Sequence, residues 1–206
     1  MWVVKLGGSL IGSPALKGWL DAFSQFGDGK VVIVPGGGLL ADAVREAQSR
    51  TGVNDAVAHE MAVVAMDQYA ALMTGLNPHL AIAASELEIA ECGWQHRAIL
   101  WKPSPMVLAD EGLPKSWELT SDSLAAWLAH KLGAQHLLIV KSYDEPPRAV
   151  VSSLQAAGVV DAKFAEYIAG KSFKTWLLAK NDYVAITHNI AHEENPPVGT
   201  QVLSDL

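Results

Sequence analysis

The chain has 206 residues, of which 50% are hydrophobic and 18% are charged, and its formal net charge is −7. This composition excludes a disordered chain. An acidic chain without a dense Lys/Arg tract also argues against nucleic acid as a partner, because binding to a phosphate backbone needs clustered cations.

Cys92 is the single cysteine, so the chain forms no internal disulfide, and no Cys/His spacing suggests a zinc site. No apolar run reaches the length of about 18 residues that a membrane helix needs, and the N-terminus lacks the regions of a signal peptide. We therefore expect a single domain over residues 1–206, located in the cytoplasm, with no membrane partner and no protein-bound metal.

Apolar periodicity predicts alternating strands and helices in the first half of the chain. The expected elements are a strand at 2–6, a helix at 14–26, a strand at 30–34, a helix at 39–49 and a long helix at 56–73. Ser13 precedes the first helix as an N-cap. The long helix is apolar on most of its circumference, which is typical of a buried helix or an interface between subunits.

The second half is less regular, and several prolines mark loops in it. The expected elements are strands at 80–83 and 99–101, a helix at 120–132, a strand at 137–141, a helix at 161–169, and strands at 176–178, 183–186 and 201–203. Helices that alternate with continuously apolar strands predict an α/β fold, with a mostly parallel central sheet sandwiched between helices on both faces.

Two glycine-rich turns follow predicted strands. Lys5-Leu6-Gly7-Gly8-Ser9 ends the first strand, and Gly36-Gly37-Gly38 follows the second. Ligands of parallel sheets bind beyond the carboxyl ends of strands, and glycine N–H groups at a helix start bind anions. A lysine beside such a turn can stabilise a phosphoryl group during transfer. Each turn alone is explained equally well as an ordinary connection between a strand and a helix.

Two common nucleotide motifs nearly match and fail. Gly7 and Gly12 have the spacing of a P-loop, but Ser13 stands where that motif needs lysine. A dinucleotide-binding motif starting at Gly36 has Asp55 near the required distance, but Asp55 opens a predicted helix and no strand precedes it, which disfavours an oxidoreductase.

A third feature is Thr120-Ser121-Asp122, which begins the helix at 120–132. A carboxylate there can accept hydrogen bonds from Lys5 and from a second lysine, and Lys163 is the candidate for that second cation. The simpler interpretations are an ordinary helix start and a solvent-exposed lysine.

These motifs, in this order, resemble the amino acid kinase family, which includes acetylglutamate, aspartate, uridylate and carbamate kinases. The matching segments are Lys5 with Gly7-Gly8-Ser9, the turn Gly36-Gly37-Gly38, the helix start at Asp122, the segment from Gly158 to Lys163, and Gly199-Thr200. The resemblance implies the α/β fold of that family, an ATP-dependent phosphotransferase on a small molecule, Mg²⁺ carried by the phosphates of ATP, and a homodimer.

The resemblance also implies residue roles. Lys5 and Lys163 would stabilise the transferring phosphoryl group, and Asp122 would organise them. The nucleotide and its phosphates would contact Gly7, Gly8, Ser9, Lys141, Ser142, Tyr143 and Asp144. The second substrate would contact Gly36, Gly37, Gly38, His59, Trp117 and Thr120.

The stretches at 59–69 and 113–123 resemble a short branch of this family, which phosphorylates aminomethyl-furanmethanol phosphate in the synthesis of methanofuran-type cofactors. That acceptor carries a phosphate, for which Lys115 or Lys102 is a candidate cation. The family usually has Asp-Gly where this chain has Asp144-Glu145. Two alternatives stay open: a carboxylate, carbamate or other phosphate acceptor, and a relative that binds a nucleotide or oxyanion without catalysis.

Overall fold

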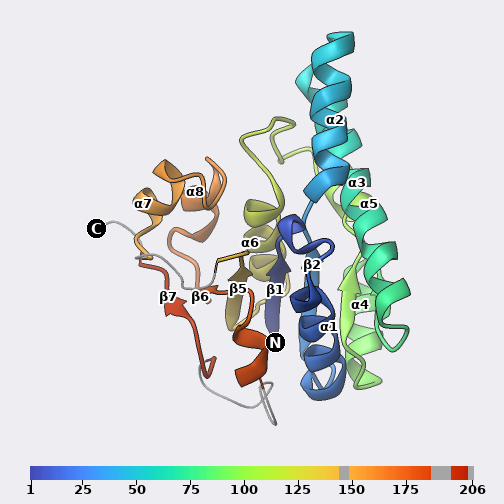
Figure 1. Ribbon diagram of the computed structural model, residues 1–206, viewed down its shortest axis with the longest axis vertical. Helices are drawn as coiled ribbons and strands as arrows, with labels where there is room; N and C mark the ends of the chain where they lie inside the picture. The colour runs from blue at the N-terminus through green and yellow to red at the C-terminus, as the bar shows by residue number, and fades with distance from the viewer. Residues whose placement is uncertain (144–148, 187–195, 204–206) are drawn as a thin grey trace.

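The computed structural model describes residues 1–143, 149–186 and 196–203 (Figure 1). Its centre is a seven-stranded sheet with the order β3-β4-β2-β1-β5-β6-β7. The strands are β1 (Trp2–Leu6), β2 (Val31–Pro35), β3 (Ala81–Ala83), β4 (Ile99–Trp101), β5 (His136–Val140), β6 (Lys174–Leu178) and β7 (Thr200–Gln201). Neighbouring strands are parallel except β6 and β7, which are antiparallel. The mostly parallel sheet predicted from the sequence is confirmed.

Eight α-helices and two short 3₁₀ helices surround the sheet in the described part of the chain. They are η1 (Gly8–Leu10), α1 (Pro14–Phe26), α2 (Gly38–Thr51), α3 (Asp55–Leu76), α4 (Glu86–Trp94), α5 (Ser104–Ala109), α6 (Ser121–Lys131), α7 (Val151–Ala156), α8 (Phe164–Ile168) and η2 (Asp182–Ala185).

The structure differs from the sequence prediction in three respects, all of them after residue 85. Helices α4, α5 and α7 were not predicted, because each is short or interrupted by proline and glycine. The strand predicted at 183–186 is wrong, since Asp182–Ala185 forms η2. The predicted helix at 161–169 shortens to α8 because Asp161 and Lys163 lie in the turn before it.

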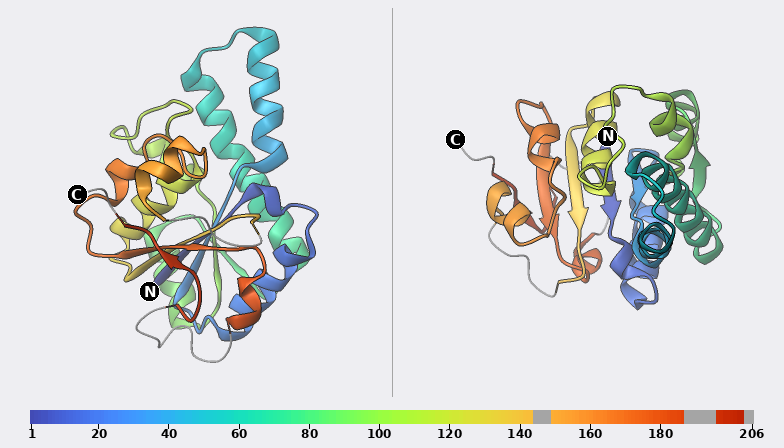
Figure 2. Two further views of the ribbon diagram at one scale, coloured as in Figure 1. Left: turned by 60° about the vertical axis from the view of Figure 1, so that its left-hand side comes forward. Right: turned by 90° about the horizontal axis from the view of Figure 1, so that it is seen from above.

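Alternating side chains of the strands pack on opposite faces of the sheet, as the two-residue period of a strand requires. Val3 of β1 lies in one hydrophobic cluster with Leu124 of α6. Its neighbour Val4 lies in another cluster with Trp19 of α1. Figure 2 shows the resulting layers, with helices on both sides of the sheet. Both faces are covered, which explains why the central strands are apolar at nearly every position.

Helices α2 and α3 form a hairpin that projects beyond the end of the sheet (Figure 1). Gly52 ends α2 in the left-handed conformation with φ 72°, and the Asn54 side chain accepts a hydrogen bond from Val57 N to start α3. Although α3 has 22 residues, no helix in the described segments is both long and apolar enough to cross a lipid bilayer.

Candidate active site

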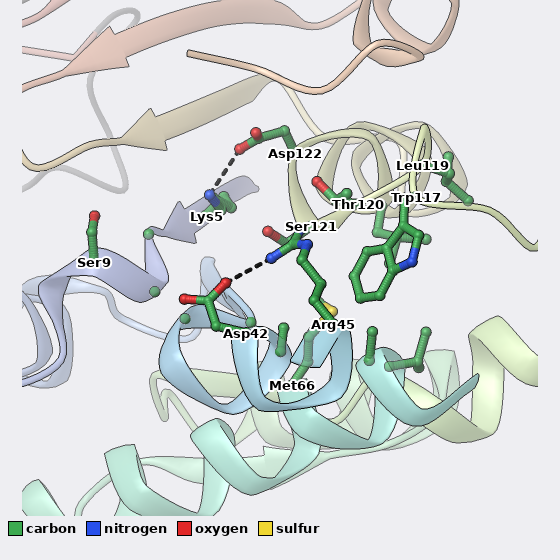
Figure 3. Close-up of a pocket in the computed structure, with 18 of the residues that line it drawn as sticks. Lys5, Ser9, Asp42, Arg45, Met66, Trp117, Leu119, Thr120, Ser121 and Asp122 are labelled. Atoms are coloured by element: carbon green, nitrogen blue, oxygen red, sulfur yellow. Dashed lines mark hydrogen bonds and ion pairs between the residues drawn. The ribbon is translucent and has the colours of Figure 1, made fainter. Parts of the chain in front are cut away.

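A cavity of about 260 Å³ opens at the carboxyl ends of β1 and β5, between the α2 start and the α6 start (Figure 3). Of the residues predicted to form a site, those that line it are Lys5, Gly7, Gly8, Ser9, Gly37, Gly38, His59, Trp117, Thr120, Asp122 and Lys141. Segments more than a hundred residues apart in the sequence therefore converge on one cavity.

The two glycine turns pack directly on each other. A Cβ atom on Gly8 would lie 2.1 Å from the Gly38 nitrogen, and one on Gly36 would lie 2.5 Å from the Gly8 nitrogen. No side chain fits into contacts of that length. The glycines are therefore required by the close approach of the turns, and this approach places both turns at the same wall of the cavity.

The amino end of α2 faces this cavity without a side-chain cap. Gly37 is its N-cap residue, has no side chain to cap the helix, and lines the cavity together with Gly38. The first N–H groups of a helix have no partner within the helix and carry the positive end of its dipole. This end of α2, which has 14 residues, is suited to binding an anion.

A buried cluster of three charges lies at the base of the cavity. Lys5 Nζ donates to Asp122 Oδ1 at 2.8 Å, and Lys141 Nζ donates to Oδ1 at 2.9 Å and to Oδ2 at 2.8 Å. The side chains of Lys5, Asp122 and Lys141 are 5%, 6% and 14% exposed. Burial alone raises the pKa of Asp122, but the ammonium groups of Lys141 and Lys5 outweigh it and hold that pKa at about 2.

Strand register explains why Lys5 and Lys141 meet. Lys5 pairs with Ile139 across the parallel strands β1 and β5. Lys141 lies two residues after Ile139, so both lysines point to the face that α6 covers. Asp122, in the first turn of α6, lies above that face.

The start of α6 is fixed by a residue from a distant segment. The Asp161 carboxylate accepts hydrogen bonds from Thr120 N and Ser123 N, both at 3.0 Å, and from both hydroxyl groups of these residues. Asp161 thereby caps α6, although it lies 41 residues after Thr120. The positive end of α6 is neutralised within the protein, in contrast to that of α2.

Another part of the cavity wall carries a cation and an aromatic ring. The Arg45 guanidinium lies 4.3 Å from the centre of the Trp117 ring and donates to Asp42 Oδ1 at 2.7 Å (Figure 3). Trp117 Nε1 donates to Gln48 Oε1 at 2.7 Å, which fixes the ring against α2. Arg45 is therefore held at the cavity by stacking on Trp117 and by an ion pair with Asp42.

His59 is buried in the same wall. Burial lowers its pKa, which favours the neutral ring. Its Nδ1 lies 3.2 Å from the Ser116 carbonyl oxygen. A carbonyl only accepts, so the neutral ring carries its proton on Nδ1 and leaves Nε2 as an acceptor. The Nδ1 atom of His59 thus has a hydrogen-bond partner within the protein, and the residue also lines the cavity.

The structure does not bring every predicted residue to this cavity. Lys163 was expected at Asp122, but its Nζ donates to Glu166 at 2.8 Å, and Lys141 occupies the second position on Asp122. Gly36, Ser142 and Tyr143 do not line the cavity, although Gly36 and Ser142 are sequence neighbours of lining residues. Asp144 lies outside the described residues.

The cations predicted for an acceptor phosphate also lie elsewhere. Lys115 Nζ donates to Glu60 at 2.7 Å on the surface. Lys102 lines a different depression, beside Ile82. Besides Lys5 and Lys141, the cation that lines the cavity is Arg45 among the described residues.

Sequence reasoning missed Asp42, Arg45 and Asp161. Asp42 and Arg45 could have been predicted from helical periodicity, because residues 41, 42 and 45 lie on the same face of α2 as Gly38. Asp161 had no such signal, since its contacts to Thr120 and Ser123 depend on tertiary packing alone. No group of three or more His, Cys, Asp or Glu side chains able to hold a metal occurs within residues 1–143, 149–186 and 196–203.

Known proteins are similar to this chain in sequence and in fold. A sequence model of the amino acid kinase family matches residues 1–148. A curated relative is the [5-(aminomethyl)furan-3-yl]methyl phosphate kinase of Methanocaldococcus jannaschii, which is 26% identical over 146 residues that span 70% of this chain and 67% of the relative.

Solved structures show the same fold at low identity. Uridylate kinase from Archaeoglobus fulgidus aligns with a TM-score of 0.66 and 18% identity, covering 91% of this chain and 96% of that one. UMP kinase from Ureaplasma parvum aligns with a TM-score of 0.64 and 14% identity, covering 98% and 97%. The arrangement of strands and helices is therefore shared with these enzymes.

Proposed function

We propose that this chain, which belongs to the amino acid kinase family, is an ATP-dependent kinase whose acceptor is [5-(aminomethyl)furan-3-yl]methyl phosphate. The observation that carries the kinase assignment is the buried Lys5–Asp122 pair in a cavity walled by two glycine turns. Phosphoryl transfer needs positioned cations and N–H donors more than covalent chemistry, and this cavity offers both.

The donor phosphates fit the first glycine turn, where Gly7, Gly8 and Ser9 would bind phosphate oxygens. The uncapped N–H groups of α2 at Gly37 and Gly38 would bind the phosphate of the second substrate, as the family resemblance implies. Lys5 would contact the phosphoryl group that moves, and Asp122 would hold the Lys5 ammonium in place. Mg²⁺ bound to the ATP phosphates would supply further charge neutralisation.

The acceptor fits the part of the cavity that Arg45 and Trp117 line. Arg45 can bind the phosphate of the acceptor through its guanidinium, and the Trp117 ring can contact a furan ring. His59 and Thr120 line the same cavity. An oxygen of the acceptor phosphate would attack the γ-phosphorus while the bond to the bridging oxygen of ADP breaks and ADP keeps the electron pair. The products are ADP and a diphosphate.

The 26% identical relative is named for this substrate, which supports the choice of acceptor. The role predicted for Lys163 rests on the family resemblance, because its ammonium is paired with Glu166. The cytoplasmic location expected from the sequence stays a prediction. The nucleotide contacts expected of Ser142 and Tyr143 also stay predictions.

We further propose that the protein acts as a homodimer through α3. Five exposed apolar side chains follow one side of this helix: Val57, Met61, Val64, Leu72 and Leu76. In a dimer with a two-fold axis, this strip would pack against the same strip of the second copy, which is the simplest symmetric way to bury it.

The kinase proposal is tested by incubating the purified protein with MgATP and [5-(aminomethyl)furan-3-yl]methyl phosphate. ADP release and a new diphosphate signal in ³¹P NMR are expected. Parallel reactions with acetylglutamate, aspartate, carbamate and UMP test the other acceptors. ADP release with one of these and none with the furan would make the furan assignment wrong, and nucleotide binding without any turnover would favour the non-catalytic alternative.

A further inference from the structure

We propose that Lys141 is a catalytic residue that contacts the transferring phosphoryl group together with Lys5. This inference rests on the proposed kinase function. The family resemblance implies that Lys141 contacts the nucleotide and that Lys163 is the second catalytic lysine. The structure instead places Lys141 in the reaction centre.

The first reason is geometric. The Nζ atoms of Lys5 and Lys141 lie 2.8 and 2.9 Å from the same oxygen, Asp122 Oδ1. The two Nζ atoms are therefore at most about 5.7 Å from each other. A transferring phosphoryl group presents three equatorial oxygens, over which its charge is spread. Two ammonium groups this close can contact different oxygens of one such group.

The second reason is charge balance. The charged residues that line the cavity in the described part of the chain are Lys5, Lys141, Arg45, Asp42 and Asp122, and His59 is neutral. Arg45 is paired with Asp42, so two buried ammonium groups share the single carboxylate of Asp122. One positive charge is left over at the base of the cavity. A buried charge without a counter-ion raises the free energy of the protein. The negative charge of a bound phosphoryl group would be that counter-ion.

The third reason is the state of Lys141 itself. Burial, opposed by Asp122 and reinforced by the Lys5 charge, lowers the pKa of Lys141 to about 8. The free protein therefore holds this ammonium at a cost that a bound phosphate would relieve. Lys163, in contrast, has its pKa raised by the Glu166 hydrogen bond, so it already has a counter-ion.

The kinetic test compares Lys141→Met, Lys141→Arg and the surface control Lys17→Met with the wild type, using MgATP and [5-(aminomethyl)furan-3-yl]methyl phosphate. Lys17 is paired with Asp21 on the exposed side of α1. We expect Lys141→Met to lower kcat by about 100-fold or more, as when one donor to a transition-state anion is removed, and to raise the KM for ATP by no more than the factor by which it weakens AMP-PNP binding. Lys141→Arg, which keeps the charge, should recover part of kcat.

An increase in the KM for ATP with kcat unchanged would overturn the proposal and assign Lys141 to ground-state nucleotide binding. Folding is checked by thermal melting. Lys141→Met removes the surplus buried charge and leaves Asp122 paired with Lys5, so it should melt at or above the wild-type temperature.

Calorimetric binding of ADP and AMP-PNP, both with Mg²⁺, separates this inference from the proposed function. The wild type should bind AMP-PNP more tightly, and Lys141→Met should lose that difference while it keeps its affinity for ADP. If the wild type binds AMP-PNP but does not phosphorylate the furan, the acceptor is wrong and this comparison still decides the role of Lys141. If the wild type binds neither nucleotide, both proposals fail. If Lys141→Met behaves like the wild type in an active kinase, only the role of Lys141 fails.

Discussion

Lys5 and Lys141 donate to the same atom, Oδ1 of Asp122, although Lys5 lies in β1 and Lys141 directly follows β5, more than 130 residues later in the sequence. The carboxylate is thus the shared counter-ion of two buried ammonium groups. This relationship gives Asp122 two effects that experiments can separate, one on stability and one on turnover.

Asp122→Asn should lower both the stability of the protein and its turnover. The pKa of Asp122 lies at about 2 instead of 3.8, so the charged carboxylate contributes stability that is present at neutral pH and lost as the pH falls from about 4 to about 2. Its removal leaves two buried cations without a counter-ion and should lower the free energy of unfolding by about 2 kcal/mol or more.

We expect kcat of Asp122→Asn to fall by about 100-fold, because Lys5 loses its fixed position. Urea unfolding and ADP release measure the two effects. Glu46→Gln, which removes a carboxylate from an exposed ion pair on α2, is the control. A variant as stable and as active as the wild type would contradict the role of Asp122.

Binding of a phosphate ligand should weaken above pH 8. The pKa of Lys141 is lowered to about 8 in the free protein, and a bound phosphate favours the ammonium. The Kd of MgAMP-PNP should therefore be nearly constant below that pH and rise as the pH increases from 8 to 9. Calorimetry in buffers of different ionisation enthalpy should detect proton uptake on binding near pH 8. Lys141→Met should remove this dependence, and a Kd that is equally flat in both proteins would make the prediction wrong.

Arg45→Gln should affect the acceptor and spare ATP. A charge-assisted hydrogen bond contributes about 1.5–3 kcal/mol, so we expect the KM for the furan phosphate to increase by about 10-fold to 100-fold. The KM for ATP should not change, because the Arg45 guanidinium is held by Trp117 and Asp42 and takes no part in the Lys5–Asp122 pair. Arg50→Gln is the matched control on the same helix, since Arg50 is exposed and paired with Glu46. An equal change with both arginine variants would exclude a specific role for Arg45.

Lys163→Met should have a smaller effect than Lys141→Met. The Lys163 ammonium contacts Glu166 and does not line the cavity, so we expect kcat to fall by less than about 10-fold. Initial-rate measurements on both variants under the same conditions make the comparison. A loss as large as that of Lys141→Met would mean that Lys163 reaches the phosphoryl group in the loaded enzyme, as the family resemblance implies.

Val64→Asp should dissociate the proposed dimer. Val64 is 43% exposed near the middle of the apolar strip of α3, and an interface with a charge at its centre is strongly disfavoured. Sedimentation velocity at micromolar concentration should show a dimer for the wild type and a monomer for this variant. Leu87→Asp, on exposed α4, should leave the dimer intact. A monomeric wild type would remove the proposal.

The predicted α/β fold was confirmed because its signals are local. The strand at 2–6 and the helix at 14–26 were predicted with the bounds that the structure has, since an apolar run and a capped amphipathic period identify them. The predicted strand at 183–186 was wrong because four residues with mixed exposure carry little periodic signal, and they form a 3₁₀ turn against α1.

The sequence by itself determined the glycine turns, the strand that carries Lys5, the helix that begins with Asp122, and the resemblance that predicted a kinase. Only the tertiary structure decided which lysine joins Lys5 at Asp122. That choice depends on the register of β1 and β5, which aligns Lys5 with Ile139 and so places Lys141 on the face below α6. The contacts of Asp161 at α6 and of Arg45 with Trp117 likewise join segments far apart in the chain. Local periodicity determines individual elements, whereas a site at the end of a parallel sheet is determined by how those elements align.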